Sequence, residues 1–195
     1  MSDFRRSSGR QRRKNVQIVV TEGLSEQIYL ERIRARFGDI PVHAVNASGG
    51  DIKKLKRECI KLIREKEAWD MLAVVTDVDE KTADEIVKFD EWCKENSVEL
   101  YISNPSFEVF LLMHYTDVKA WMSQEDLEEA LTSHLGRRYD KSRGITVYED
   151  SVKDAMNRAE RSLPKDSDDV ETVSRTRGTT NFHRLLSKIS QRLKR

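Results

Sequence analysis

The sequence lacks any apolar segment that could cross a membrane. Its longest apolar runs, Met71 to Val75 and Val109 to Met113, are far shorter than the roughly 18 to 20 residues of a bilayer span. No apolar stretch follows the basic N-terminus, so we expect no secretory signal and predict a cytoplasmic location. Cys59 and Cys93 are the only cysteines and lack Cys-x-x-Cys spacing, so neither a disulfide framework nor a zinc site is indicated. We expect both in the core.

An excess of charge of one sign is also absent. Lys and Arg number 35 and Asp and Glu number 34, which gives a formal net charge of +1. This balance excludes a uniformly basic surface of the kind that coats nucleic acid, but it leaves local basic patches open. With 37% hydrophobic and 35% charged residues in 195, the composition is typical of one polar domain with a modest core.

Three regions of the chain differ in their residue pattern. Residues 1–14 are rich in Arg and Ser and have little apolar surface to bury, which predicts a mobile basic arm. Residues 15–116 alternate between strand and helix patterns, which predicts an α/β core. Residues 117–195 are less regular, and we expect a helical C-terminal extension packed on that core.

The pattern of the core predicts its sheet. Short apolar segments rich in β-branched residues are bounded by turn residues and alternate with helical patterns. Such alternation favours a parallel sheet covered by helices, so we expect an α/β fold of the Rossmann-like kind with a mainly parallel, four-stranded sheet. The four strands are predicted at residues 15–20, 41–47, 70–77 and 98–102.

Helices are expected where apolar residues recur at helical spacing. A capping box, Thr82-x-x-Glu85, should begin one of them, and Asn104-Pro105 should begin another with Asn104 as its N-cap. Ser123 should cap a helix of the extension, whereas residues 164–180 are polar and predict turns. The helices are predicted at about residues 24–37, 52–63, 82–93, 104–115, 124–135, 151–163 and 181–193.

Acidic side chains follow two of the predicted strands. Glu22 follows the first strand, and Asp77 and Asp79 follow the third. Parallel sheets bind ligands outside the carboxyl ends of their strands, and residues two apart in an extended segment point to the same side. Asp77 and Asp79 could therefore converge on one cation, which would relieve their repulsion, and oxygen ligands suit Mg²⁺ or Mn²⁺. The alternative is that these acids merely end strands and begin turns.

Two further acids could reach the same edge of the sheet. Glu26 lies one helical turn beyond Glu22, although an acid in a first turn is also stabilised by the helix dipole. Glu108 would project toward this edge if the fourth strand neighbours the third, and would otherwise be a solvated helix charge. Asn104 is expected to be a cap rather than a ligand, and His114 lies on an apolar face and is expected in the core.

These residues carry a resemblance to a known family. Thr21 to Glu26 after one strand and Thr76 to Asp79 after another look like the Toprim signature, a glutamate followed by an Asp-x-Asp pair. Asn104 to Glu108 is similar to the Asn-Pro-x-Phe-Glu motif of the RloB family. Two later segments also resemble motifs of that family, so that the resemblance covers roughly residues 15–195: the Tyr-x-Lys of residues 139–141 and the Thr-Leu-Leu helix of residues 179–186.

The resemblance implies a Toprim-like nuclease from anti-phage or abortive-infection loci, acting beside an AAA-type ATPase of the RloA kind. Related Toprim enzymes use the two aspartates to hold Mg²⁺ and the glutamate as a metal ligand or general acid/base. Glu26 matches the second glutamate in the overcoming-lysogenization-defect nucleases. Carboxylate-held cations also suit phosphodiester cleavage, because they stabilise the attacking and leaving oxygens. The expected catalytic residues are Glu22, Glu26, Asp77, Asp79 and Glu108, with Glu22, Asp77 and Asp79 as metal ligands.

Binding of nucleic acid would need cations near that edge of the sheet. Two loops are rich in arginine and lysine, and an aromatic residue among them suits stacking on an unpaired base. Similar clusters also occur on inert loops, and neighbouring acidic stretches leave a protein partner open. The candidate nucleic-acid-binding residues are Arg137, Arg138, Tyr139, Lys141, Arg143, Arg175 and Arg177.

The leading expectation is therefore a Mg²⁺-dependent endonuclease that cuts DNA or structured RNA such as tRNA. A catalytically silent subunit that binds nucleic acid or restrains the ATPase is the main alternative. A haloacid-dehalogenase-like phosphatase with Asp77 as nucleophile ranks lower, because no later Asp pair follows an apolar strand. No membrane partner is expected, and a homo-oligomer is compatible with the sequence.

Overall fold

The computed structural model describes residues 16–38, 42–49, 51–65, 69–79, 81–164 and 170–193, without the side chains of residues 191–193. The basic arm predicted for residues 1–14 lies outside the described residues. Among the residues described, no helix is both long and apolar enough to span a membrane.

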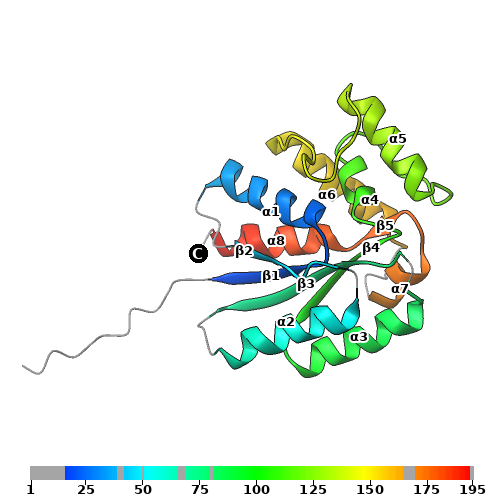
Figure 1. The fold of residues 1–195 in the computed structure, drawn as a ribbon. Helices are drawn as coiled ribbons and strands as arrows, with labels where there is room; N and C mark the ends of the chain where they lie inside the picture. The colour runs from blue at the N-terminus through cyan, green and yellow to red at the C-terminus, as the bar shows by residue number, and fades with distance from the viewer. Residues whose placement is uncertain are drawn as a thin grey trace, which may run out of the picture.

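A mostly parallel sheet forms the centre of the fold (Figure 1). Its strand order is β2-β1-β3-β4-β5, and the first four strands are parallel to one another. The short β5 pairs antiparallel with β4, so the prediction of four strands is wrong by one. The strands are β1 (Gln17–Thr21), β2 (Val42–Asn46), β3 (Met71–Asp77), β4 (Glu99–Asn104) and β5 (Thr179–Thr180).

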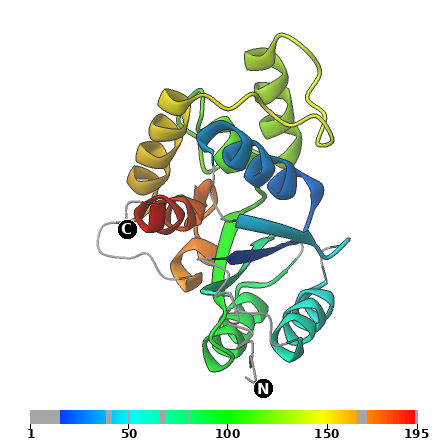
Figure 2. The same ribbon diagram turned by 90° about the vertical axis from the view of Figure 1, so that its left-hand side faces the viewer.

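Helices cover both faces of the sheet (Figures 1 and 2). Helices α2 (Ile52–Arg64) and α3 (Ala83–Glu95) cover one face, and α7 (Val170–Arg175) packs beside α3. The opposite face carries α1 (Leu24–Phe37) and α8 (Phe182–Leu193), with three helices farther out or toward the β5 edge. These three are α4 (Glu108–Leu112), α5 (Gln124–Leu135) and α6 (Glu149–Ser162).

Alternation along the strands divides the core in two, because successive side chains of a strand point to opposite faces. Ile18 and Val20 of β1 belong to the cluster under α2 and α3, whereas Val19 belongs to the cluster on the other face. Every residue of β1 is buried, as is expected for a central strand covered on both sides.

The C-terminal extension shares the core of the first 116 residues. Phe182 of α8 packs edge-on against Tyr29, Phe107 and Phe110, with ring centroids 4.9 to 5.7 Å apart. Such aromatic pairs contribute beyond the area that they bury. The extension is therefore joined to the α/β core by a continuous apolar cluster.

Most of the helix signals are confirmed in detail. Thr82 and Ser123 each form the expected capping box, and α1 and α5 have the predicted bounds. Both cysteines are free and buried. His114 is also buried, between the Tyr29 hydroxyl and Ser151 Oγ, and burial lowers its pKa to about 3. The expectation of a core histidine is thus confirmed.

The prediction for the segment after β4 is wrong. Asn104 is the last residue of β4, because β4 continues through it to pair with Thr179, and α4 begins only at Glu108. The Asn104 amide donates hydrogen bonds to the carbonyls of Val173 and Ser174 instead of capping a helix. Residues 164–180 likewise contain α7 and β5 rather than turns alone.

Candidate functional site

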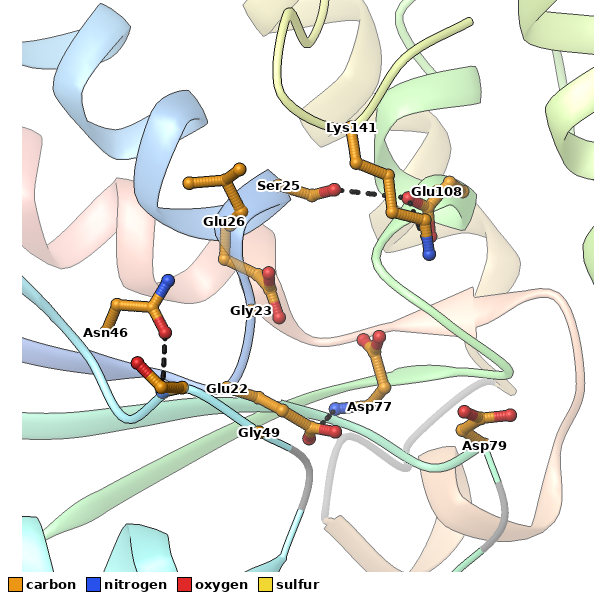
Figure 3. Close-up of a pocket in the computed structure, with 12 residues that line it drawn as sticks. Glu22, Gly23, Ser25, Glu26, Asn46, Gly49, Asp77, Asp79, Glu108 and Lys141 are labelled. Atoms are coloured by element: carbon orange, nitrogen blue, oxygen red, sulfur yellow. Dashed lines mark hydrogen bonds and ion pairs between the residues drawn. The ribbon is translucent and has the colours of Figure 1, made fainter.

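An acidic pocket of about 470 Å³ lies at the carboxyl ends of β1 and β3 (Figure 3). The chain crosses from β1 to β2 on one side and from β3 to β4 on the other, so the pocket lies at a topological switch point of the sheet. The structure brings together all five acids expected from the sequence, and one of the expected cations. These lining residues are Glu22, Glu26, Asp77, Asp79, Glu108 and Lys141.

Glu22 is held firmly by its neighbours. Its carboxylate accepts hydrogen bonds from the Thr76 hydroxyl and from the backbone N–H of Asp77, the latter at 3.0 Å. The Lys81 ammonium bridges both carboxylate oxygens at 3.0 and 3.1 Å, and the two side chains are only 11% and 13% exposed. The charge of Glu22 is therefore already compensated in this structure.

Glu108 is also surrounded by donors. Its Oε1 accepts hydrogen bonds from the Tyr139 hydroxyl at 2.8 Å and from Ser25 at 3.2 Å, and Oε2 accepts one from Gln124 at 3.3 Å. Lys141 Nζ lies 3.6 Å from Oε1. Burial opposes the charge, but Lys141 and the Tyr139 hydrogen bond outweigh it, so the pKa of Glu108 lies below its ordinary value.

Asp77 and Glu26 have the opposite surroundings. Asp77 Oδ1 and Glu26 Oε1 are buried and have no hydrogen-bond partner among the residues described. Burial raises the pKa of Glu26 to about 7, and the neighbouring charges of Glu22 and Glu108 add to the effect. Burial, followed by the charges of Glu26 and Glu108, raises the pKa of Asp77 well above its ordinary value. Neither carboxyl group forms an ion pair among the described residues, and the charges of Lys141 and Lys81 only partly offset the rise of the two pKa values.

Gly23 allows Glu26 to approach the loop after β1. A Cβ atom at position 23 would lie 3.0 Å from Glu26 Oε2, closer than side-chain packing normally permits. A residue with a Cβ atom here would require the Glu26 carboxylate to shift by a few tenths of an ångström. This contact supplies a physical reason for a Glu-Gly pair at the end of β1.

Asp79 reaches the pocket by a route that differs from the prediction. The expected convergence with Asp77 assumed an extended backbone, but β3 ends at Asp77 and Asp79 has a φ of 36° in a turn. The Asp79 N–H donates to the Pro105 carbonyl at 2.8 Å, which ties this turn to the start of the segment before α4. Asp79 is exposed, and it lines the same pocket as Asp77 (Figure 3).

The donor set fits a hard divalent cation in its chemistry. Within the described ranges, no three His, Cys, Asp or Glu side chains are already arranged to hold a metal ion. The buried, unpartnered oxygens of Asp77 and Glu26 are nevertheless what a cation would satisfy, and carboxylate oxygens are the ligands that Mg²⁺ prefers. Asp77, Asp79, Glu22 and Glu26 are the residues that would hold it, with Lys81 now paired to Glu22.

The loop of residues 137–143, predicted to bind nucleic acid, partly serves to hold Glu108 of the pocket. Tyr139 is only 7% exposed and its hydroxyl binds Glu108, so its ring cannot stack on a base as predicted. Arg137 donates to the carbonyls of Arg138 and Gly144, which closes the loop on itself. Lys141 faces the acids of the pocket, where Figure 3 shows its ammonium directed toward them. Arg138 and Arg143 are exposed.

The other predicted arginines lie away from the pocket lining. Arg175 pairs with Glu171 and Asp84, at 3.1 and 3.2 Å, and Arg177 donates to the Met122 carbonyl at 3.2 Å. Both side chains are exposed, so they remain on the surface but are engaged within the molecule. The structure therefore brings one of the seven candidate binding residues, Lys141, into the pocket itself.

Sequence reasoning missed several residues that shape the site. Ser25 and Thr76 bind Glu108 and Glu22, and each adjoins a predicted acid in the sequence, which is the signal that could have indicated them. The Tyr-x-Lys motif is visible in the sequence, but its contact with Glu108 is not. Lys81 offered no such signal, because nothing in the local pattern distinguishes it from a surface lysine before a helix cap.

Comparison with known proteins gives one match. The chain matches the family described as RloB-like protein over residues 17–189, which is most of its length. No curated protein and no solved structure matches the chain.

Proposed function

The chain belongs to the RloB-like protein family, and from this membership together with the acidic pocket we propose that it is a Mg²⁺- or Mn²⁺-dependent endonuclease with a Toprim-like core. Its substrate in this proposal is DNA or a structured RNA such as tRNA. It acts in phage defence, in the cytoplasm, with an AAA-type ATPase of the RloA kind as its partner.

One observation carries this proposal: buried carboxylate oxygens without partners lie at the switch point of a parallel sheet. Uncompensated buried charges are costly, so they are usually neutralised by a proton or a cation. The same edge of a parallel sheet is where such folds bind their ligands. A cation-dependent reaction explains both facts together.

The residues of the pocket have distinct roles in this proposal. A divalent cation supplies charge neutralisation for the phosphoryl oxygens. Asp77 and Asp79, with Glu22, hold and orient the site, and Glu108 is kept ionised by Tyr139 and Lys141. Burial raises the pKa of Glu26 to about 7, and a divalent cation held beside it would lower this pKa and favour the carboxylate as a further ligand.

Cleavage of labelled DNA and tRNA in the presence of Mg²⁺ or Mn²⁺ tests the proposal. We expect Asp77→Asn and Glu22→Gln each to lower the cleavage rate at least 100-fold. Asp154→Asn, at an exposed site on α6, is the matched control and should leave the rate unchanged. The assay is run with and without the ATPase, and full activity of both pocket variants would refute the assignment.

A catalytically silent subunit is the second candidate, and one contact favours it. Lys81 already compensates Glu22, as would be expected if this acid had a structural task only. Calorimetric titration with Mg²⁺ distinguishes the two: a nuclease should bind the ion at a site that Asp79→Ala weakens. A silent module that binds nucleic acid or the ATPase should show no such site.

A further inference from the structure

The outer face of α2 carries the strongest local positive charge among the described helices. Its 13 residues include six Lys or Arg and one acid, Glu58, in a chain whose net charge is only +1. Four of these cations recur at helical spacing on one stripe and all are exposed. They are Lys53, Arg57, Lys61 and Arg64.

The side chains of this stripe are not neutralised by ion pairs among the described residues. Within the described ranges, none of the four side chains forms an ion pair with an acidic residue. Like charges three or four residues apart on a helix repel each other, so the stripe costs stability unless an anion binds it. By contrast, the exposed lysines and arginines of α6 are paired with nearby acids, as Lys153 is with Glu149 and Arg161 with Asp117.

The segment before α2 lines the acidic pocket, so the stripe begins a few residues beyond it. Ser48 and Gly49, which precede α2, line the pocket, and the Gly49 N–H donates to the Glu22 carbonyl at 3.3 Å. Because α2 joins the carboxyl end of β2 to the amino end of β3, it runs from the pocket back along the sheet. The distance from Lys53 to Arg64 is about 16 Å, which matches about five phosphates of one strand.

Helix α5, on the opposite flank of the pocket, has the reverse charge, and the exposed cations of that flank, Arg138, Lys141 and Arg143, lie in the loop after it. Helix α5 contains four acids and no Lys or Arg, and its first residue, Gln124, is bonded to Glu108 of the pocket. A polyanion that approached over α5 would meet Glu125, Asp126, Glu128 and Glu129. The charges of the two helices thus favour an approach over α2 and oppose one over α5.

We propose that the exposed stripe of α2 binds the phosphate backbone of a nucleic acid that enters the acidic pocket from the β2 side of the sheet. This inference rests on the proposed function, since it takes the polyanion to be the substrate of that pocket. It requires a substrate that extends about five nucleotides beyond the cleaved bond. Direct binding of oligonucleotides separates it from the question of catalysis.

The test is binding of fluorescent oligonucleotides to the full chain in EDTA, where cleavage does not occur. The variant replaces the four stripe residues by glutamine, a good helix former. The control replaces four exposed cations elsewhere, Arg34, Arg36, Lys153 and Arg161, so that the net charge changes equally. Single-stranded DNA, duplex DNA and RNA of 20 nucleotides form parallel arms, and a four-nucleotide strand is included.

We expect the stripe variant to bind 20-nucleotide strands at least tenfold more weakly than the control. A plot of the logarithm of the association constant against the logarithm of the salt concentration has a negative slope. This slope should become shallower by about 3 to 4 in the stripe variant, as expected for four lost phosphate contacts. Binding of the four-nucleotide strand should change less than twofold. Equal binding of the oligonucleotides by the two variants would overturn the proposal. Binding to phosphatidylserine vesicles is measured as well, and a stripe substitution that weakens only vesicle binding would also overturn it.

These outcomes remain distinct from those of the cleavage assay. Stripe-dependent binding without cleavage in Mg²⁺ or Mn²⁺ would refute the nuclease and retain the backbone-binding surface. Cleavage by a stripe variant with unchanged affinity and unchanged salt dependence would refute the surface alone. Unfolding curves of both variants check that neither result comes from loss of the fold.

Discussion

Glu108 and Glu26 line the same pocket and are only 1% and 2% exposed, yet their surroundings are opposite. Glu108 accepts hydrogen bonds from Tyr139, Ser25 and Gln124, and Lys141 lies nearby. Glu26 retains a buried oxygen without a partner among the described residues. Glu22 resembles Glu108 in being compensated, and Asp77 resembles Glu26 in keeping a buried oxygen without a hydrogen-bond partner among the described residues.

The difference indicates a division of labour within the pocket. Compensated carboxylates are held in one orientation by their hydrogen-bond donors, so they can serve as a frame. Uncompensated carboxylates make the pocket responsive, because a proton or a cation lowers the free energy of the folded state there. Each prediction below changes one of the pocket carboxylates or a residue that contacts it. All stability measurements are made in EDTA unless Mg²⁺ is stated.

The largest effect is expected when Glu22 is deprived of its counter-charge. Lys81→Met should lower the free energy of unfolding by about 4 kcal/mol, because it leaves a nearly buried carboxylate beside Asp77 and Glu26. Urea unfolding at pH 7.5 measures the loss, and added Mg²⁺ should restore part of it. Lys153→Met removes an exposed pair on α6 and should cost no more than about 0.5 kcal/mol. A loss no larger than this control would show that Glu22 needs no compensation.

A gain in stability is expected when the charge of Glu26 is removed. The folded state keeps a proton on Glu26 up to a pKa of about 7, whereas the unfolded chain loses it near 4.5. The stability contributed by this proton is therefore fully present below about pH 4.5 and is lost as the pH rises through about 7. Glu26→Gln should stabilise the protein by up to about 3 kcal/mol at pH 8 and flatten this pH dependence.

Urea unfolding between pH 5 and pH 8 checks this prediction. Glu31→Gln, an exposed site on the same helix, is the control and should reproduce the pH profile of the unchanged protein. The prediction fails if Glu26→Gln is no more stable than that control at pH 8. Asp77→Asn should act in the same direction, because burial also raises the pKa of Asp77.

The comparison also shows what the sequence could and could not predict. The chain segments that carry local signals were predicted closely: the capping boxes at Thr82 and Ser123 begin helices as expected. The acids after β1 and β3 were found because parallel strands bring their carboxyl ends to one edge. By contrast, β5 has two residues and exists through its pairing with Ser103 and Asn104, which no local pattern reveals.

Partners within the site were harder to predict than its members. Tyr139 contacts Glu108 from 31 positions away, and its burial depends on how the extension packs on the core. A tyrosine among arginines has the composition of an exposed binding loop, so the local pattern favoured the wrong surroundings. Lys81 raises the same difficulty, since its contact with Glu22 joins residues 59 positions apart.

A smaller effect is expected from weakening the frame at Glu108. Tyr139→Phe removes a 2.8 Å hydrogen bond to a buried carboxylate and should cost about 2 kcal/mol. The pKa of Glu108 should rise, because this hydrogen bond is one of the contacts that lower it. Urea unfolding measures the first effect and ¹³C NMR of the carboxyl group the second. Tyr148→Phe, at an exposed tyrosine, is the control, and equal costs would contradict the role of Tyr139.

The smallest effect on stability is expected at Asp79, which belongs to neither kind of carboxylate because it is exposed. Asparagine tolerates the positive φ of 36° at this position, so Asp79→Asn tests the charge without straining the turn. The free energy of unfolding should change by less than about 0.5 kcal/mol. Affinity for Mg²⁺, measured by calorimetry, should nevertheless fall at least tenfold if Asp79 holds the ion with Asp77. An unchanged affinity would remove Asp79 from the proposed ligand set and leave the buried acids to bind the cation alone.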